Sequence, residues 1–442
     1  MSLPRTWWPC LRQPASPWDI DRVRFRPEEK FRKGGIEMRR FVIVVVVFSL
    51  FLTLGYVEGA RSAMRIGALY PLSGSLALLG EESWRGAEIA RVMRNQKGGV
   101  AGQQVDFLKV DIPDVNATKS EAERLISREG LKLLTGTYSS SLCLAASEVA
   151  ARAGIVYFEQ GGIADLITGR GYKTLFRTCP KAQYFSKTQL KYTSDWIAPR
   201  INKKPSEVRL ALVHEDSAYG SSISKNVEAE VKAAGIALIS VLPYSAQAVD
   251  LSSVILRLKN EKPDVVIGVS YANDAILFGR QAKELGLDIK GFIGTGGGHS
   301  LRSFQEALGS AAEGVLNVDF TQYEVNTKFT PGLKEFVEAY RKAFNEPPRS
   351  GHSLANFMGT NVLLDILEKT GGSMDPGKFR QVAMAMDVKP GNTASGWGVK
   401  FDEGGQNVAA EPLMMQWRGG KIVCVWPEGA AVVKAELIRP FK

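Results

Sequence analysis

The chain has 442 residues, 45% of them hydrophobic, which is enough for sizeable buried cores and predicts two or three domains. Its formal net charge is +10, but residues 1–59 hold ten Lys/Arg against six Asp/Glu, so the remainder carries +6. That remainder has no cluster of basic residues interleaved with aromatic ones, and the cysteines lack C-x-x-C or metal-ligand spacing, which argues against nucleic-acid binding and against a metal or cofactor.

The N-terminal segment is typical of an export signal. The sequence Met-Arg-Arg at residues 38–40 precedes fourteen uncharged residues, 41–54, and small residues follow up to Gly59. A basic start, an apolar core of this length and small residues at a cleavage point indicate a secretory signal peptide, whereas a membrane anchor needs a longer apolar run. We therefore predict a signal peptide at residues 38–59, cleavage near Ala60 and export to the periplasm.

The first 37 residues are rich in proline, arginine and tryptophan and show no periodicity. The signal segment is complete without them. We interpret residues 1–37 as a non-native upstream extension, with Met38 as the natural start.

Residues 64–162 alternate between strand-like and helix-like segments. Short apolar runs predict strands at residues 64–71, 105–110, 131–134 and 155–158. Helical composition or spacing predicts helices at residues 80–96, 117–128 and 142–151. This alternation predicts a parallel sheet covered by helices on both faces.

Three consecutive serines, Ser139, Ser140 and Ser141, lie between a predicted strand and a predicted helix. The first N–H groups of a helix lack partners and the dipole there is positive, so this place suits a carboxylate or a phosphate. From these residues alone, a serine that caps the helix beside two solvated ones is the commoner arrangement.

A second alternating unit begins near residue 208. Strands are predicted at residues 208–213, 264–269 and 292–293, and helices at residues 251–258, 331–344, 353–369 and 376–386, before a short β-like tail. In doubly wound sheets, ligands bind at the carboxyl ends of the strands. The positions at such ends are the serines, residues 159–162, Tyr219, Tyr271 and the glycine run at 294–298. Their coincidence favours ligand binding over helix capping for the serines.

Several short motifs carry a resemblance to a known family. They lie at residues 69–74 (Leu-Tyr-Pro-Leu-Ser-Gly), 97–102 (Lys-Gly-Gly-Val-Ala-Gly), 139–141, 168–172, 176–178, 216–220 (Asp-Ser-Ala-Tyr-Gly), 250–252, 256–259 and 263–264. In order and spacing the chain resembles the type I periplasmic binding proteins, specifically the leucine/isoleucine/valine-binding branch that serves ABC importers. The resemblance extends from about Met64 to about Asp402.

This resemblance implies an α/β fold of two doubly wound, Rossmann-like lobes, which are joined by three hinge strands and close on a ligand like a clamshell. Each lobe is then discontinuous: residues 64–182 plus 321–405 form the N-terminal lobe, and residues 183–320 plus 406–442 form the C-terminal lobe. It further implies a monomeric binding protein without enzyme activity, which delivers a small molecule to ABC permease subunits in the inner membrane.

The resemblance also assigns expected roles to individual residues. Ser140 falls where a serine hydroxyl and N–H hold the α-carboxylate of the ligand. Gly161 falls where a backbone carbonyl accepts from the α-ammonium. Tyr219 and Tyr271 match tyrosines that reach across from the second lobe.

Two positions depart from the family pattern on the ammonium side. Ile163 stands where the branched-chain binders have a threonine, and Gly296 stands where they have an acid. Glu159 either supplies a replacement charge or is an exposed loop acid, because acids are seldom buried unpaired. The expected ligand is therefore a hydrophobic, branched-chain-type amino acid or a related small carboxylate without an ammonium group.

Enzyme signatures are weak in this sequence. Gly294 and Gly296 lack the third spaced glycine of a dinucleotide fingerprint, and there is no Gly-x-Ser-x-Gly element for a serine nucleophile. The histidines His214, His299 and His352 are far apart in the sequence, which argues against a catalytic triad or a zinc site. The alternatives to transport are an amide or urea sensor on the same fold and a secreted α/β hydrolase.

Overall fold

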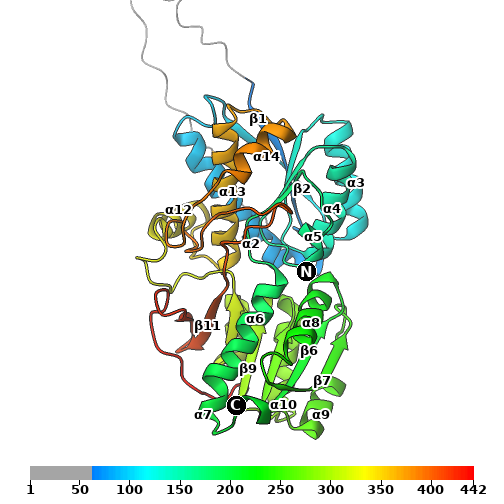
Figure 1. The fold of residues 1–442 in the computed structure, drawn as a ribbon, viewed down its shortest axis with the longest axis vertical. Coiled ribbons are helices and arrows are strands. Elements are labelled where there is room, and N and C mark those ends of the chain that lie inside the picture. Colours follow the sequence, from blue (N-terminus) through cyan, green and yellow to red (C-terminus); the bar gives the residue numbers. More distant parts are fainter. Residues whose placement is uncertain (1–61) are drawn as a thin grey trace, which may run out of the picture. The chain divides into compact units, whose positions relative to one another are not determined.

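Two sheets organise residues 62–442, the part of the chain that the computed structural model describes (Figure 1). The upstream extension and the signal peptide expected in residues 1–59 lie outside the described residues. Within residues 62–442, no helix has the length and apolar character needed to cross a membrane.

The first sheet has five parallel strands in the order β2-β1-β3-β4-β5. They are β1 (Met64–Tyr70), β2 (Val105–Asp111), β3 (Leu133–Gly136), β4 (Val156–Glu159) and β5 (Leu175–Arg177). Every residue of β3, β4 and β5 is buried. Parallel strands covered on both faces are expected to be near-continuous apolar runs, and these short segments follow that pattern.

Helices from two distant parts of the sequence surround this sheet. The early ones are α2 (Ala77–Gln96), α3 (Val115–Ser127), α4 (Ser140–Arg152) and α5 (Leu166–Gly169), and the late ones are α12 (Leu333–Phe344), α13 (Gly351–Lys369) and α14 (Pro376–Met384). Helix α13 packs along α2, and in Figure 1 the orange α13 and α14 lie beside the blue first elements of the chain. Because α13 is apolar nearly all round, it is a buried helix.

The second sheet has seven strands in the order β12-β11-β10-β9-β8-β6-β7. They are β6 (Arg209–Glu215), β7 (Ala237–Tyr244), β8 (Val265–Val269), β9 (Gly291–Thr295), β10 (Leu316–Asp319), β11 (Leu413–Arg418) and β12 (Lys421–Trp426). Strands β6 to β10 are parallel, whereas β11 and β12 form an antiparallel hairpin at one edge.

The helices that accompany the second sheet are α6 (Ala182–Tyr192), α7 (Ala198–Arg200), α8 (Ala218–Glu230), α9 (Ser252–Glu261), α10 (Ala272–Glu284) and α11 (Arg302–Leu308). A π-helical segment, η2 (Thr193–Ile197), joins α6 to α7. Short 3-10 turns complete this part at η3 (Pro205–Glu207), η4 (Gly297–Ser300) and η5 (Gly309–Ala312), and η1 (Gly74–Leu76) precedes α2.

The chain passes between the two sheets three times, after β5, after β10 and before β11. Two of these crossings run side by side, because the amide of Arg177 donates to Gly405 O (2.8 Å) and the amide of Asn407 donates to Arg177 O (2.9 Å). The fold is thus the two-lobed α/β architecture with connecting segments. The lobe boundaries at residues 182/183, 320/321 and 405/406 stay a prediction.

Candidate functional site

A small cavity of about 20 Å³ lies where strand ends of both sheets meet. This volume is about enough for one water molecule. Its wall is formed by Leu79, Tyr138, Ser140, Gly161, Ile163, Phe185, Tyr219, Tyr271, Gly296, Gly297, Phe320 and His352. Most of these residues closely follow a strand, which is where doubly wound folds bind their ligands.

Six of the nine residues expected at the site line this cavity: Ser140, Gly161, Ile163, Tyr219, Tyr271 and Gly296. Ser140 is the first residue of α4, whereas Tyr219 is the second residue of α8 and Tyr271 directly precedes α10. The cavity therefore combines the start of one helix from the first sheet with the starts of two helices from the second. Ser139, Ser141 and Glu159 do not line it.

Ser140 presents a free hydroxyl proton to the cavity. Its side chain is 1% exposed, and its Oγ accepts hydrogen bonds from the amides of Ile163 (3.2 Å) and Ala164 (3.1 Å). These bonds fix the oxygen and leave its proton available to an acceptor. The first amides of α4 have no partner within the helix, so the group suits a carboxylate.

The neighbouring serines join the two sides of the cleft. Ser139 occupies the N-cap position of α4 without a side-chain capping bond, and its hydroxyl instead lies 3.3 Å from the Tyr271 hydroxyl. Ser141 Oγ accepts from the Ala218 amide at 3.4 Å. Helix capping by the Ser139 hydroxyl is therefore not what the structure shows.

The structure places Glu159 differently from both expectations, which were a replacement charge at the ligand and an exposed loop acid. It is fully buried, so it is not an exposed loop acid, and it does not line the cavity. One carboxylate oxygen accepts from the amides of Gly161 (2.8 Å) and Gly162 (2.7 Å). The other accepts from Thr137 N–H (2.9 Å) and from the Tyr157 hydroxyl (3.1 Å), whose single proton is shared with Gly136 O (2.9 Å). Four donors occupy the carboxylate, which shapes the loop after β4 and has no contact left for an ammonium group.

The two tyrosines of the second sheet are neutral hydrogen-bonding groups. The Tyr219 hydroxyl donates to Thr295 O, and its ring lies 5.1 Å from the Tyr271 ring between centroids. Burial raises the pKa of both phenols, so neither ionises near neutral pH. Their oxygens remain available as acceptors.

Near Gly296, the closest acid is Asp319, and it is also already engaged. Its carboxylate accepts from the Phe320 amide (2.7 Å) and from Gln322 Nε2 (3.1 Å). Burial raises the pKa of this carboxyl to about 6. Asp319 does not line the cavity, so the wall contains no carboxylate.

Sequence analysis missed five wall residues, Leu79, Tyr138, Phe185, Phe320 and His352, and covered Gly297 only as part of the glycine run at 294–298. Tyr138 directly precedes the serine motif that was singled out, and that motif was the available signal. Phe320 and His352 come from segments with no local motif, and only the fold brings them to the site. With them, six aromatic or imidazole rings face the cavity, which suits an apolar or aromatic ligand body.

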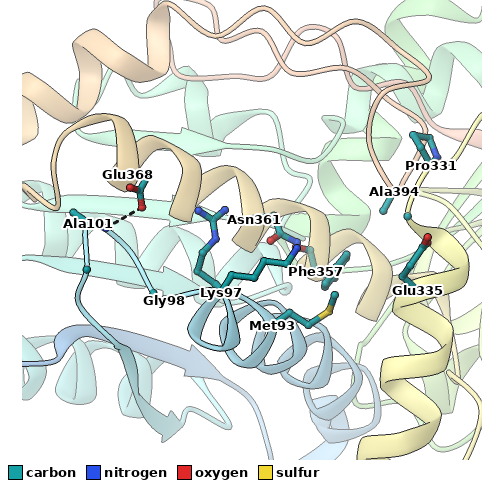
Figure 2. Close-up of a pocket in the computed structure, with 14 residues that line it drawn as sticks. Met93, Lys97, Gly98, Ala101, Pro331, Glu335, Phe357, Asn361, Glu368 and Ala394 are labelled. Carbon is teal, nitrogen blue, oxygen red and sulfur yellow. Dashed lines mark hydrogen bonds between the residues drawn. The ribbon is translucent and has the colours of Figure 1, made fainter.

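A larger recess of about 600 Å³ lies elsewhere, beside the ends of α2 and α13 (Figure 2). Two of its polar side chains are already engaged: Glu368 accepts from the Ala101 amide at 2.9 Å (Figure 2), and Arg94 forms an ion pair with Asp365, which lies outside the lining. None of the expected site residues lines it. We therefore place the candidate site at the smaller cavity, where strand ends and unpaired donors converge.

Metal and thiol chemistry find no support in residues 62–442. No group of three or more His, Cys, Asp or Glu side chains in that range is placed to hold a metal ion. Cys143, Cys179 and Cys424 are buried free thiols. Of the histidines, His214 Nδ1 lies 2.8 Å from Glu215 O, and His299 is buried among aromatic rings.

Comparison with known proteins decides the family. The sequence profile described as periplasmic binding protein matches residues 63–421. The chain belongs to the periplasmic binding protein family. Members of this family are substrate-binding proteins rather than enzymes and are found in the periplasm or outside the cell. The resemblance to the leucine/isoleucine/valine-binding branch is confirmed by curated Leu/Ile/Val-binding protein homologs that are 42–44% identical to this chain.

Similar curated proteins include the Leu/Ile/Val-binding protein homolog 7 of Brucella suis, 42% identical over 394 residues, which are 89% of this chain and 98% of that protein. Homolog 8 of Brucella abortus is 44% identical over 376 residues, or 85% and 93%. A leucine-binding protein of Thermotoga maritima has a TM-score of 0.72 at 21% identity, covering 84% of this chain and 99% of that one. A solute-binding protein of R. palustris in complex with benzoate has a TM-score of 0.71 at 21% identity, covering 85% and 99%.

Proposed function

We propose that this periplasmic binding protein captures a hydrophobic or branched-chain-type amino acid, or a related small carboxylate, between its two lobes. The observation that carries the proposal is the convergence in one cavity of the Ser140 hydroxyl, the start of α4 and an aromatic wall. The donors suit a carboxylate and the rings suit an apolar body. The names of the relatives, which include leucine, isoleucine and benzoate binders, support the same ligand classes.

Capture requires the lobes to separate. A cavity of about 20 Å³ cannot admit leucine, so the described arrangement is a closed one. Polar contacts between the two sides include one cluster at Asp165. The Asp165 amide donates to Ser222 Oγ (3.0 Å), and Ser222 Oγ (3.5 Å) and Asn226 Nδ2 donate to the Asp165 carboxylate. We propose that rotation about the three crossings opens the cleft, with lobes at residues 64–182 plus 321–405 and 183–320 plus 406–442.

The transport context is part of the proposal. Export through the signal peptide at residues 38–59 places the mature chain in the periplasm, where it works as a monomer. There it delivers the ligand to the permease subunits in the inner membrane. The confirmed family membership and the composition of residues 38–59 support this assignment.

A ligand panel tests the function. Leucine, isoleucine, valine, phenylalanine, their deaminated acids, benzoate, urea and acetamide are added to protein that has been unfolded, dialysed and refolded to remove bound ligand. We expect a hydrophobic amino acid or small carboxylate at a hundred times its dissociation constant to stabilise the protein by roughly 2.7 kcal/mol, measured as a rise in melting temperature. Stabilisation by urea or acetamide alone would favour the sensor alternative, and turnover of a ligand would favour an enzyme.

Ser140→Ala is expected to weaken ligand binding by about 1.5–3 kcal/mol, because it removes a hydrogen bond to a charged carboxylate. The melting temperature of the free protein should also fall, since the amides of Ile163 and Ala164 lose their acceptor. Calorimetric titration and a melting curve measure both effects. The matched control is Ser141→Ala, one residue along the same helix but outside the cavity wall, which should change affinity by less than about 1 kcal/mol. Unchanged affinity in Ser140→Ala would leave that serine a purely structural role.

A further inference from the structure

His352 carries an unpartnered polar atom in the cavity wall. Its side chain is 3% exposed, and its Nε2 has no hydrogen-bond partner among the described residues. The other ring nitrogen, Nδ1, lies 3.4 Å from Ser83 Oγ. Buried polar atoms are nearly always satisfied, so an unsatisfied one at a ligand cavity points to the ligand as its partner.

The start of α13 is held firmly, and this fixes the position of His352. The amides of Arg349 and Ser350 both donate to the buried Glu82 carboxylate (3.0 and 3.2 Å). Ser350 Oγ in turn accepts from the His352 amide at 3.3 Å. Gly351 lies against Thr321 O, where a Cβ would sit 1.8 Å away, so the backbone cannot shift without a collision.

The imidazole ring itself is held on several sides. Gly86 of α2 lets the two helices approach closely, because a Cβ there would lie 1.9 Å from Ser353 O, and this brings Ser83 to the ring. The rings of Tyr138 and Phe320 contact the imidazole at centroid distances of 5.5 and 5.1 Å. A side chain held in this way presents Nε2 in one direction.

The imidazole is neutral at neutral pH, since burial lowers the pKa of His352 to about 3. A neutral ring has one N–H and one lone pair. When Nδ1–H donates to Ser83 Oγ (3.4 Å), the lone pair lies on Nε2, the ring nitrogen that has no partner among the described residues. His352 then contributes a hydrogen-bond acceptor to a cavity whose wall lacks both the threonine and the acid of the branched-chain pattern.

The charge balance of the wall favours a zwitterion. No wall residue carries a formal charge at neutral pH. A bound monoanion would bury an uncompensated charge, whereas an amino acid brings both charges and a net charge of zero. Its ammonium group still needs acceptors, and Gly161 O is one expected from the family pattern.

We propose that His352 is a specificity-determining residue of this cleft, accepting a hydrogen bond from the α-ammonium group of an amino acid through Nε2. This inference rests on the proposed function and narrows its ligand from small carboxylates to amino acids. It assigns to a neutral imidazole the task that Glu159 cannot perform, because four donors already occupy that carboxylate.

The test compares phenylalanine with 3-phenylpropanoate, and leucine with 4-methylpentanoate, by calorimetric titration. The full-length secreted protein should prefer each amino acid over its deaminated acid by about 10- to 100-fold, the range for a hydrogen bond to a charged group. His352→Phe keeps a ring but no nitrogen, and it should reduce this preference to about twofold or less, because binding of the amino acids weakens more than binding of the deaminated acids. His352→Gln, which keeps a polar atom near the Nε2 position, should retain part of the preference.

A measurement on the unaltered protein covers the case in which His352→Phe does not fold. The ¹⁵N signal of His352 Nε2 should shift when phenylalanine binds and stay in place when 3-phenylpropanoate binds. An unchanged preference in a folded His352→Phe protein would overturn the inference, as would a preference for the deaminated acids or an Nε2 signal unmoved by phenylalanine. Binding of the deaminated acids but of neither amino acid would overturn the inference and leave the proposed function standing, whereas failure of every amino acid and small carboxylate of the ligand panel would refute both.

Discussion

Arg177→Met is expected to lower the free energy of unfolding by about 4 kcal/mol. Its buried guanidinium group donates to four acceptors and has no carboxylate partner among the described residues. Arg177 is fully buried. Its Nε donates to Gln406 Oε1 (2.6 Å), and its terminal nitrogens donate to the carbonyls of Gly162 (3.0 Å) and Ala164 (2.8 Å) and to Thr168 Oγ1 (3.1 Å). Methionine fills much of the volume but removes the donor from all four buried acceptors. Ala164 O keeps a backbone amide donor at 3.1 Å, whereas Gln406 Oε1 and Gly162 O keep long contacts of 3.5 and 3.6 Å.

The same substitution should also weaken ligand binding. The carbonyls of Gly162 and Ala164 flank Ile163 in the loop whose amides hold Ser140 Oγ, so loss of the guanidinium loosens the carboxylate side of the cavity. Urea denaturation followed by tryptophan fluorescence measures the loss of stability, and calorimetric titration measures affinity. The control is Arg65→Met, in which a 42% exposed side chain loses its ion pair with Glu129 at a cost of about 1 kcal/mol or less. Equal losses of stability and affinity in Arg177→Met and Arg65→Met would contradict the idea that the hydrogen bonds of Arg177 hold this part of the structure together.

The architecture was predictable because its strands are short, buried and parallel. Residues 156–158 of β4 and all of β8 are apolar runs between turn residues, and this composition indicates burial on both faces of the sheet. Strand β7 was missed because it lies at the edge of its sheet, carries several exposed or half-buried residues, and contains Pro243. In an edge strand one set of backbone groups needs no partner, so proline is tolerated and the apolar pattern is weakened.

The placement of Ser140, Tyr219 and Tyr271 in one cavity wall was predictable for a related reason. Ser140, Tyr219 and Tyr271 each follow a strand at its carboxyl end, and parallel strands bring such ends to one edge of a sheet. His352 and Phe320 were not predictable, because their place depends on chain segments that return to the site after long separations. The position of His352 in particular depends on the close approach of α2 and α13, which Gly86 permits. No local sequence pattern predicts this approach.

Glu159 shows why a charged residue near a predicted pocket is hard to interpret from sequence. The residue ends β4, and the chain continues Gln160-Gly161-Gly162. An acid followed by amides in a tight loop can turn its carboxylate either outward to a ligand or inward to those amides. The structure shows the inward arrangement, in which the carboxylate replaces water as the partner of three backbone N–H groups.

Glu159→Gln is therefore expected to destabilise the free protein by about 3 kcal/mol. A glutamine side chain keeps one oxygen, which can accept from the amides of Gly161 and Gly162, but it turns its NH₂ group toward the Thr137 amide. Two donors then face each other in a buried place, and the remaining bonds lose the strength that the charge supplied. Tyr157 can adapt by accepting from the NH₂ group, since its hydroxyl also donates to Gly136 O (2.9 Å).

Urea denaturation of the ligand-free protein measures this loss, and Glu148→Gln is the matched control. Glu148 lies on α4 with a 42% exposed side chain and a 3.6 Å ion pair to Arg152, so its substitution should cost about 0.5 kcal/mol or less. The result also separates the ligand-binding role that the sequence suggested for Glu159 from the structural role that the structure suggests. If Glu159 contacts the ligand, the Glu159→Gln protein should keep the stability of the free protein. It should lose affinity for amino acids but not for deaminated acids. A structural carboxylate lowers stability in the absence of any ligand and weakens binding of amino acids and deaminated acids alike, because the loop that carries Gly161 and Ile163 loses its anchor.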